Sequence, residues 1–341
     1  MIDTGVTAIL DRSLSGEQIT PSEAHELMGY APGTPEVYAM MWAANKLTRE
    51  MTGGQAVVSV QIGLDHGPCP ENCKFCSLSA EAALFEPSEL SLDEVVGLAR
   101  GAVAEGASGV GLMATAALDF DRYIRLAEAV VEAVGEETRV GANIADFGPA
   151  EARRLKSVGI AGVYHAVRLR EGVDTGITPE RRQATISAAR DAGLPVGYWV
   201  DPVGPEHTAD EIIAAMYDAK AVAPHGGGVC ERVPVPGSAI GDGSGRLSRQ
   251  ELARLVAITR LVVGRDGNSV GHHEPNILCM CAGASNVCVE IGANPRDRAV
   301  DSSRGRGITV AKAREMLESC GYTIARRQWG CGCGEDVTGC G

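Results

Sequence analysis

The sequence predicts an α/β fold, a complete or nearly complete (β/α)8 barrel with a helical N-terminal lead-in and a cysteine-rich C-terminal extension. Strand-like and helix-like segments alternate from residue 55 onward with short connections, which is typical of a parallel sheet with helices outside. Seven or eight such units fit into about 240 residues, close to the usual size of this barrel. The hydrophobic content of 45% in 341 residues is enough for a sizeable core.

Three regions are expected along the chain. Residues 1–54 form the lead-in, because 14–30 and 34–54 carry helix starts and apolar positions at a period of 3.6. Residues 55–295 hold the repeated units of the barrel. Residues 296–341 form the extension, since the composition there shifts to Gly, Arg and Cys.

The barrel segments are assigned from their composition and from the turn residues between them. The expected strands are 56–64, 109–115, 139–145, 162–169, 195–204, 228–236 and 268–274, with 277–283 as the start of an eighth unit. The expected helices are 90–107, 119–135, 148–158, 178–193, 207–222 and 248–264. A doubly wound open sheet is the competing fold. It is weakened because no phosphate loop or G-x-G-x-x-G element opens the first unit.

Charge and targeting signals limit the classes of function. The chain has 31 basic and 44 acidic residues and a net charge of −13. Nucleic acids and anionic membranes are therefore unexpected partners. There is neither an apolar run of about 18 residues nor a signal-peptide pattern, so a cytoplasmic protein is expected. In that compartment the eleven cysteines favour metal or iron–sulfur ligation over a disulfide framework.

Three cysteines stand close together just after the first expected strand. Cys69, Cys73 and Cys76 lie in GPCPENCKFCSLS with the spacing C-x3-C-x2-C. Three thiolates on one loop can hold three irons of a [4Fe–4S] cluster, which leaves the fourth iron open to another ligand. In a barrel, chemistry gathers where the strands end, as here. A structural zinc site is the alternative, but this spacing is uncommon for zinc and no fourth ligand is evident nearby.

This loop resembles the cluster loop of the radical S-adenosylmethionine (radical SAM) superfamily, and CPENCKFC is most similar to its biotin synthase branch. The resemblance extends over about residues 10–300 and includes the methylornithine and hydrogenase-maturation relatives. It implies a [4Fe–4S] cluster with an open iron that binds S-adenosylmethionine (SAM). It further implies that SAM is split to a 5′-deoxyadenosyl radical, with electrons from a donor such as ferredoxin or flavodoxin.

The resemblance also implies residues that bind SAM. Phe75 matches the aromatic residue beside the adenine, and Glu171 in RLREG matches an acidic residue that holds the cofactor. Arg182 in TPERR matches an arginine that pairs with the methionine carboxylate, a suitable bidentate contact. Asn143 could reach a ribose hydroxyl. The competing interpretations are an exposed helix residue for Arg182 and a satisfied turn residue for Asn143.

The sequence departs from biotin synthase at the sulfur donor. That family builds a second, sacrificial [2Fe–2S] cluster from three barrel cysteines and an arginine. The matching strands here read GVGLM, RVGAN and PVGYW, without cysteine, and the arginine's strand reads NSVGHHEP. The usual donor cluster therefore cannot be built at those positions.

Seven cysteines follow residue 278, and six of them form two groups with the identical spacing C-x-C-x6-C. Cys279 and Cys281 are expected at the start or mouth of the eighth strand, where Cys331 and Cys333 could meet them. We expect these four thiols to hold an auxiliary iron–sulfur cluster. A structural zinc site and a reactive tail are the alternatives. Three other cysteines could replace any of the four: Cys288, Cys320 and Cys340.

Sulfur insertion at an unactivated C–H bond is the leading functional hypothesis. Split lipoyl synthases are biotin-synthase-like, so an octanoyl chain on a carrier protein or peptide is the preferred substrate, with a second radical SAM subunit as a partner. A biotin synthase-like small-molecule substrate remains open. The second hypothesis is a sulfur-free radical rearrangement or cofactor maturation. The third is a non-enzymatic iron–sulfur or zinc scaffold.

Overall fold

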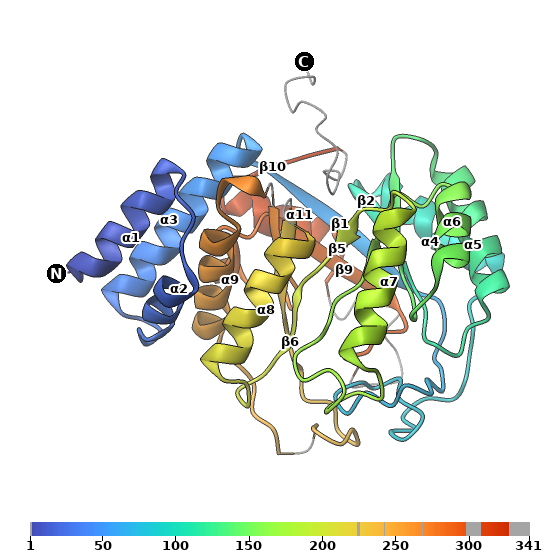
Figure 1. Cartoon of the computed structure of the whole chain (residues 1–341). Coiled ribbons are helices and arrows are strands. Elements are labelled where there is room, and N and C mark those ends of the chain that lie inside the picture. Colours follow the sequence, from blue (N-terminus) through green and yellow to red (C-terminus); the bar gives the residue numbers. More distant parts are fainter. Residues whose placement is uncertain (1, 224–225, 242, 268, 298–307, 327–341) are drawn as a thin grey trace.

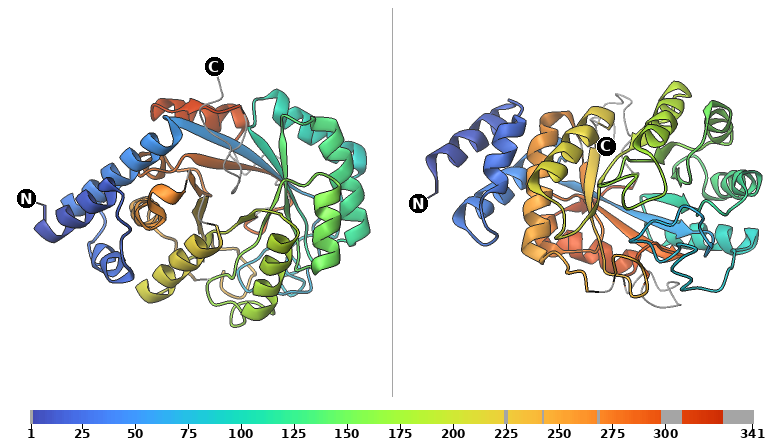
Figure 2. Two further views of the ribbon diagram at one scale, coloured as in Figure 1. Left: turned by 45° about the horizontal axis from the view of Figure 1, so that its top comes forward. Right: turned by 60° about the horizontal axis from the view of Figure 1, so that its bottom comes forward.

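The computed structural model describes residues 2–223, 226–241, 243–267, 269–297 and 308–326. Its strands form a curled parallel sheet with helices outside (Figure 1; Figure 2). The strands are β1 Gln55–Gly63, β2 Gly109–Met113, β3 Arg139–Asn143, β4 Gly162–Tyr164, β5 Val196–Gly197, β6 Val200–Val203, β7 Gly226–Glu231, β8 Ser269–His272, β9 Asn286–Gly292 and β10 Thr323–Ile324.

One extended segment closes the sheet into a ring. The hydrogen-bonded order is β5-β4-β3-β2-β1-β9-β8-β7-β6, so the path ends at β5 and β6. These two strands are separated only by Tyr198 and Trp199. The segment pairs with β4 through Val196 and with β7 through Val200. The expected (β/α)8-type architecture is thereby confirmed, with its fifth strand divided in two.

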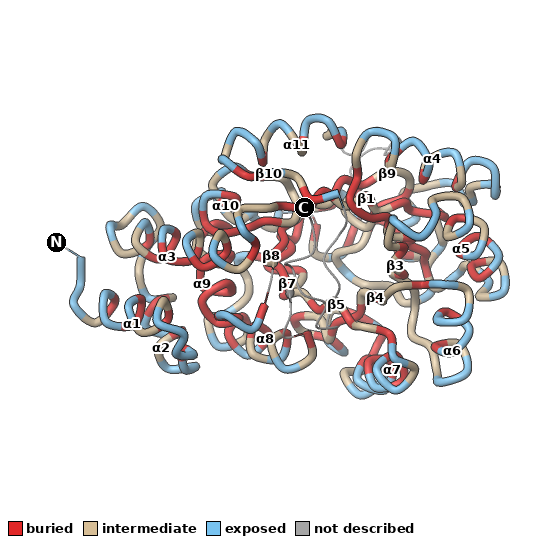
Figure 3. The backbone as a smooth tube through the Cα atoms, turned by 90° about the horizontal axis from the view of Figure 1, so that it is seen from above, coloured by how far each residue is buried: buried red, intermediate tan, exposed pale blue. Residues whose placement is uncertain are grey.

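The outer helices begin at side chains that cap them. Ser91, Thr208 and Ser248 each open a helix with a capping box, in which a glutamate three residues on bonds back to the cap. Figure 3 shows the strands buried and the outward faces of the helices exposed. These helices are α4 Leu92–Ala104, α5 Phe120–Val134, α6 Pro149–Ser157, α7 Pro179–Asp191, α8 Ala209–Val222 and α9 Arg249–Val263.

The lead-in consists of three helices rather than the two expected: α1 Thr4–Ser15, α2 Pro21–Met28 and α3 Pro35–Thr52. Gly16 ends α1 in the left-handed conformation, with a φ of 105°. Helices α2 and α3 contact α9 outside the ring, and α1 packs on α2 and α3 (Figure 1). Leu27 and Leu47 are among the fully buried side chains of this contact.

The prediction for 277–283 as a strand is wrong. Ile277–Cys281 is the short helix α10, and the eighth strand of the ring is β9, which starts five residues after α10 ends. Asn276 starts α10, since its Oδ1 accepts from the Leu278 N–H at 3.0 Å. His272 Nε2 in turn accepts from the Asn276 N–H at 3.0 Å. A short apolar run has no periodicity that separates helix from strand, so this local capping decided the outcome.

The described part of the extension packs on the barrel. Helix α11, Val310–Ser319, contacts β1 and β9, and β10 pairs with the start of β1 through Gln55 and Thr323. Among the described residues, no helix combines the length and apolar character needed to cross a bilayer.

Candidate active site

The cysteine loop starts at the end of β1 and is held in place by buried side chains. Asp65 is buried and accepts hydrogen bonds from the N–H groups of Thr115, at 2.8 Å, and Gly67, at 3.2 Å. This carboxylate therefore ties the start of the loop to the end of β2. At the far side, Ser77 donates through its N–H to Pro295 O at 2.9 Å and through its Oγ to Asn294 O at 2.7 Å.

Hydrogen bonds within the loop fix the positions of the three cysteines. The Cys69 N–H donates to Leu78 O at 2.9 Å, and the Ala80 N–H donates back to Cys69 O at 3.0 Å. Asn72 adopts the left-handed conformation, with a φ of 45°, and its Oδ1 accepts from the Glu81 N–H at 3.1 Å. The loop's own backbone and side chains therefore define its conformation.

The three thiols are near enough to influence one another's charge. Burial, and then the neighbouring Cys73, raise the pKa of the Cys76 thiol to about 12. Burial also raises the pKa of Cys73, while the guanidinium of Arg168 opposes that rise. The Leu78 N–H points at Cys76 Sγ, 3.4 Å away. Backbone N–H donation to sulfur stabilises thiolate ligands of iron.

The donor set fits an iron–sulfur cube better than a single ion. In the part of the chain that the structure describes, no three His, Cys, Asp or Glu side chains converge in the arrangement that one metal ion needs. Thiolate ligands of a cube each bind a different iron and therefore stand further apart. Cys69, Cys73 and Cys76 offer three thiols from one loop for such a cube.

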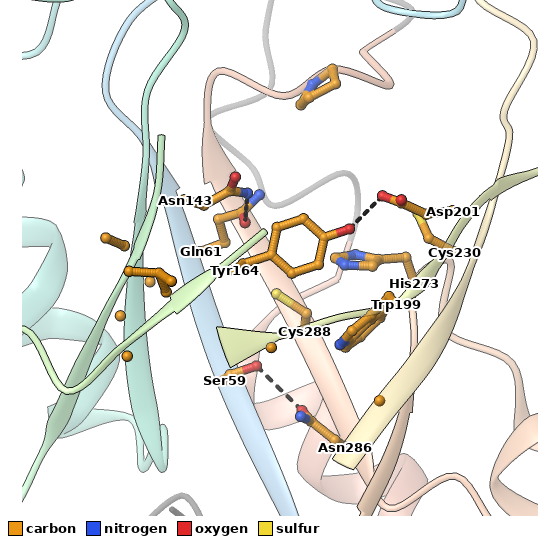
Figure 4. A pocket seen from close by; sticks show the side chains of 18 of the residues that line it. Ser59, Gln61, Asn143, Tyr164, Trp199, Asp201, Cys230, His273, Asn286 and Cys288 are labelled. Atoms are coloured by element: carbon orange, nitrogen blue, oxygen red, sulfur yellow. Dashed lines mark hydrogen bonds between the residues drawn. The ribbon is translucent and has the colours of Figure 1, made fainter. Parts of the chain in front are cut away.

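A cavity of about 260 Å³ lies inside the ring (Figure 4). It reaches the cysteine loop, because Phe75, one residue before Cys76, belongs to its lining. Three of its polar pairs join different strands: Tyr164 donates to Asp201, Asn143 Nδ2 donates to Gln61 Oε1 at 3.0 Å, and Ser59 Oγ donates to Asn286 Oδ1 at 3.3 Å.

Glycines make room for this cavity on one half of the ring. Gly111, Gly141 and Gly197 line it from β2, β3 and β5. A Cβ built on any of the three would meet nothing closer than 3.7 Å. They lie in the GVGLM, RVGAN and PVGYW segments, where the biotin synthase resemblance places the missing cysteines. The space beside these three positions is therefore open to the cavity.

Two of the four predicted SAM residues line the cavity, and the other two lie beside it in a buried network. Phe75 and Asn143 are in the lining, whereas Glu171 and Arg182 are not. Arg182 is 4% exposed, so the interpretation as an exposed helix residue is wrong. Its Nε donates to Glu171 Oε2 at 3.2 Å and its Nη1 donates to Asp146 Oδ1 at 3.3 Å.

Arg168 is a candidate residue that the sequence argument missed. It lies four residues after the end of β4, lines the cavity, and stands near both Cys73 and Asp201. Its Nε is 4.0 Å from Asp201 Oδ2. The signal was available, because polar side chains just past a barrel strand gather at the catalytic face. Within the segment RLREG, the family resemblance indicated Glu171 rather than Arg168.

The expected ligands of an auxiliary cluster are not brought together among the described residues. Cys279 is fully buried in the core, whereas Cys281 is exposed and lies next to Cys320. Residues i and i+2 point to different sides of a helix, which explains the divergence. Cys331 and Cys333 fall outside the described residues, so this ligand set stays a prediction.

Helix α10 also lies at the opposite end of the barrel from the cysteine loop. It precedes β9, whereas the loop follows β1, and the two strands run parallel from Val57 beside Asn286 to Gly63 beside Gly292. Seven strand residues span about 20 Å. A cluster held by Cys281 would therefore be far from the first one.

Replacing Arg182 by methionine should destabilise the fold by about 3 kcal/mol, since Glu171 and Asp146 would lose their shared buried cation. Urea unfolding measures the change. Arg190→Met on the same helix is the matched control, because Arg190 is exposed and should change stability by less than about 0.5 kcal/mol. Equal losses in both variants would contradict the buried network.

Asp146 should make stability depend on pH below about 4. Burial raises its pKa, but the hydrogen bond from His165 and the charge of Arg182 outweigh burial and bring the pKa to about 2. A carboxyl with a depressed native pKa stabilises the fold above its unfolded pKa, and that contribution is lost as the pH falls through the native value. The stability gap between the wild type and Asp146→Asn should therefore shrink from about pH 4 to about pH 2. An unchanged gap in urea unfolding would refute this.

Known proteins agree with this fold and loop. The model of the radical SAM superfamily matches residues 67–219. The biotin synthase of Hyphomonas neptunium is 30% identical over 253 residues, which cover 69% of this chain and 78% of that protein. The biotin synthase of Kocuria rhizophila is 28% identical over 264 residues, 74% of this chain and only 55% of the relative.

Two solved structures share the whole architecture. Methylornithine synthase superposes with a TM-score of 0.79 at 16% identity, over 93% of this chain and 97% of that one. The hydrogenase maturase HydG from Carboxydothermus hydrogenoformans superposes with a TM-score of 0.76 at 19% identity, over 94% of this chain and 79% of that one. These likenesses concern the fold.

The barrel, the three-cysteine loop and these matches define an enzyme class: the chain belongs to the radical SAM superfamily. Within it, the chain is a distant homologue of the biotin synthases. Membership implies a [4Fe–4S] cluster and SAM.

Proposed function

We propose that this enzyme acts on a small organic molecule held in the barrel cavity, from which a 5′-deoxyadenosyl radical abstracts a hydrogen atom. The observation that carries the proposal is the continuity between loop and cavity. Phe75 from the loop and Arg168 beside Cys73 both belong to the cavity lining. When bound, the cluster supplies the one electron that splits the sulfonium of SAM.

The residues around the loop have distinct proposed roles. Phe75 lies against the adenine and Asn143 binds a ribose hydroxyl. Arg168 is a carboxylate partner for the methionine part of SAM, because its guanidinium belongs to the cavity lining. Arg182 already bonds to two carboxylates, so it and Glu171 act mainly by holding the turn after β4, where Glu171 Oε2 accepts from the Arg168 N–H at 2.9 Å.

We further propose that the reaction ends without sulfur insertion, as a rearrangement or a step in cofactor maturation. Two observations support this. The strands that the biotin synthase resemblance matches to the donor ligands carry no cysteine and contribute glycines to the cavity lining. Cys279 and Cys281 precede β9, about 20 Å from the loop end of the barrel. A flavodoxin- or ferredoxin-class donor would supply electrons.

Sulfur insertion is the second candidate, and the identity to biotin synthases favours it. It would act on an octanoylated carrier protein or peptide, with a second radical SAM subunit, or on a small molecule. Its sulfur donor would be an auxiliary cluster on Cys279, Cys281, Cys331 and Cys333. To donate sulfur, such a cluster must lie close to the substrate in the cavity.

Anaerobic incubation with SAM, reductant and candidate substrates tests both outcomes. Octanoylated carrier peptide and free small carboxylic and amino acids form the two substrate arms. We expect the wild type to form 5′-deoxyadenosine and a product of unchanged sulfur content. Product sulfur matched by loss of cluster sulfide would establish insertion instead. If no arm yields 5′-deoxyadenosine, the proposed cleavage of SAM to a radical is refuted.

Iron and sulfide analysis of the same protein tests whether a second cluster exists. Iron and sulfide are counted in the wild type and in the triple variant C69A/C73A/C76A. We expect the triple variant to lose 5′-deoxyadenosine formation completely. If it still holds a full cube's worth of iron, the auxiliary cluster exists and the sulfur-insertion candidate gains its donor.

A further inference from the structure

The half of the cavity wall that faces the glycines carries two thiols. Val229, His272 and Val287 stand side by side on β7, β8 and β9. The next residue in each segment belongs to the cavity lining, since side chains alternate along a strand. These residues are Cys230, His273 and Cys288. Ser59 pairs with Cys288 in register on β1.

Both thiols line the cavity, but they differ in exposure. Cys230 is 4% exposed, and its Sγ accepts from Arg296 Nη1 at 3.4 Å. Cys288 is only partly buried, and Figure 4 shows its sulfur among the side chains that line the cavity. A molecule in the cavity therefore meets the sulfur of Cys288.

Cys288 also keeps its proton at neutral pH. Burial and the nearby Glu290 raise its pKa to about 12. A protonated thiol carries an S–H bond that is weaker than the C–H bonds of alkyl groups. An alkyl radical can therefore take the hydrogen atom from it in a downhill step, which a thiolate could not offer.

We propose that Cys288 is a catalytic residue that donates a hydrogen atom to carbon radicals formed in this cavity. The proposal rests on the proposed function above and concerns how its radical is quenched. The S–H bond breaks, a C–H bond forms on the radical carbon, and Cys288 is left as a thiyl radical. One electron from the flavodoxin- or ferredoxin-class donor and one proton from solvent restore the thiol.

The whole reaction balances. One electron splits SAM into methionine and the 5′-deoxyadenosyl radical, which takes a hydrogen atom from the substrate. The rearranged substrate radical takes a hydrogen atom from Cys288, and a second electron with a proton reduces the thiyl. Each turnover thus consumes one SAM, two electrons and one proton, and SAM is a co-substrate rather than a recycled cofactor.

The test needs no knowledge of the substrate. In D2O the thiol exchanges to S–D, whereas the carbon-bound hydrogens of the protein do not exchange. Holoenzyme is incubated in D2O with SAM and dithionite but without substrate, so that the 5′-deoxyadenosyl radical itself is the carbon radical in the cavity. We expect the 5′-deoxyadenosine to carry a single deuterium, read by mass spectrometry.

Variants assign the label to one residue. Cys288→Ser keeps the shape but offers an O–H bond that is too strong to donate, so the deuterium should be lost while 5′-deoxyadenosine still forms. Cys230→Ala is the matched control from the same wall and should keep the label. Tyr164→Phe removes a phenol of the lining, whose O–H also exchanges with solvent, and this variant should also keep the label.

The outcomes separate the two levels of proposal. Absence of 5′-deoxyadenosine from the wild type refutes the proposed function. Formation of 5′-deoxyadenosine without deuterium refutes Cys288 as the donor and leaves the proposed function standing. Loss of the label in the Cys230 or Tyr164 variant, with retention in Cys288→Ser, assigns the donor to another residue and overturns the inference.

Discussion

Cys73→Ala should abolish the formation of 5′-deoxyadenosine, to the level of the triple variant C69A/C73A/C76A. A cube held by two thiolates leaves a second iron without a protein ligand, so the cluster is lost or no longer bound in one orientation. Cys73 also stands beside Arg168, the proposed partner of the SAM carboxylate. Loss of the Cys73 thiol would therefore disturb both the cluster and Arg168. Anaerobic SAM cleavage, followed by chromatography of the nucleoside, measures the effect.

The fold of this variant should survive. The loop is held by the contacts of Asp65 and Ser77, which do not involve the Cys73 side chain. Cys320→Ala is the control, because it removes a thiol at the other end of the barrel. It should retain cleavage and loop-bound iron. Cleavage at the wild-type rate by Cys73→Ala would contradict the assignment of the loop as the cluster site.

Gly63→Ala should destabilise the protein by roughly 3 kcal/mol or more. Gly63 ends β1 beside Gly292 of β9. A Cβ on Gly63 would lie 1.8 Å from Ala293 O and 2.6 Å from Ala293 N. These are backbone atoms and cannot rotate away. The two strands would therefore have to separate at the end of the sheet where the cysteine loop begins.

Urea unfolding of the metal-free protein measures this effect, and Gly97→Ala is its control. Gly97 lies on the exposed face of α4, and a Cβ there meets nothing within 4 Å. Alanine at that helix position should stabilise by about 0.5–1 kcal/mol. If Gly63→Ala unfolds at the urea concentration of the wild type, the close approach of β1 and β9 is not required.

The barrel could be predicted because each unit carries its own signals. Ser91, Thr208 and Ser248 start helices with a glutamate three residues later, which is a local pattern. The eighth unit could not be predicted in the same way. Its outcome depended on the bond between the Asn276 N–H and His272, a contact with the preceding strand that a five-residue apolar run does not announce.

The part of the candidate site that lies within one stretch of sequence could be predicted. The part that the fold assembles from distant residues could not. The spacing of Cys69, Cys73 and Cys76 belongs to one loop. The cavity, in contrast, is made by residues whose inward orientation depends on register, such as Cys288 opposite Ser59. Cys288 was seen only as part of a C-terminal cysteine group, because the spacing of cysteines in the sequence does not say which thiol enters the barrel.

The contact between the cysteine loop and the last turn of the barrel has a consequence for biogenesis. Ser77 and Asn294 are 217 positions apart, yet their hydrogen bond helps to hold the loop. During synthesis, the cysteines leave the ribosome long before the strand that supports them. Such long-range closure is slow, because the loop-closing entropy must be overcome first. We therefore expect iron to be loaded at this loop late, after nearly the entire chain has been made.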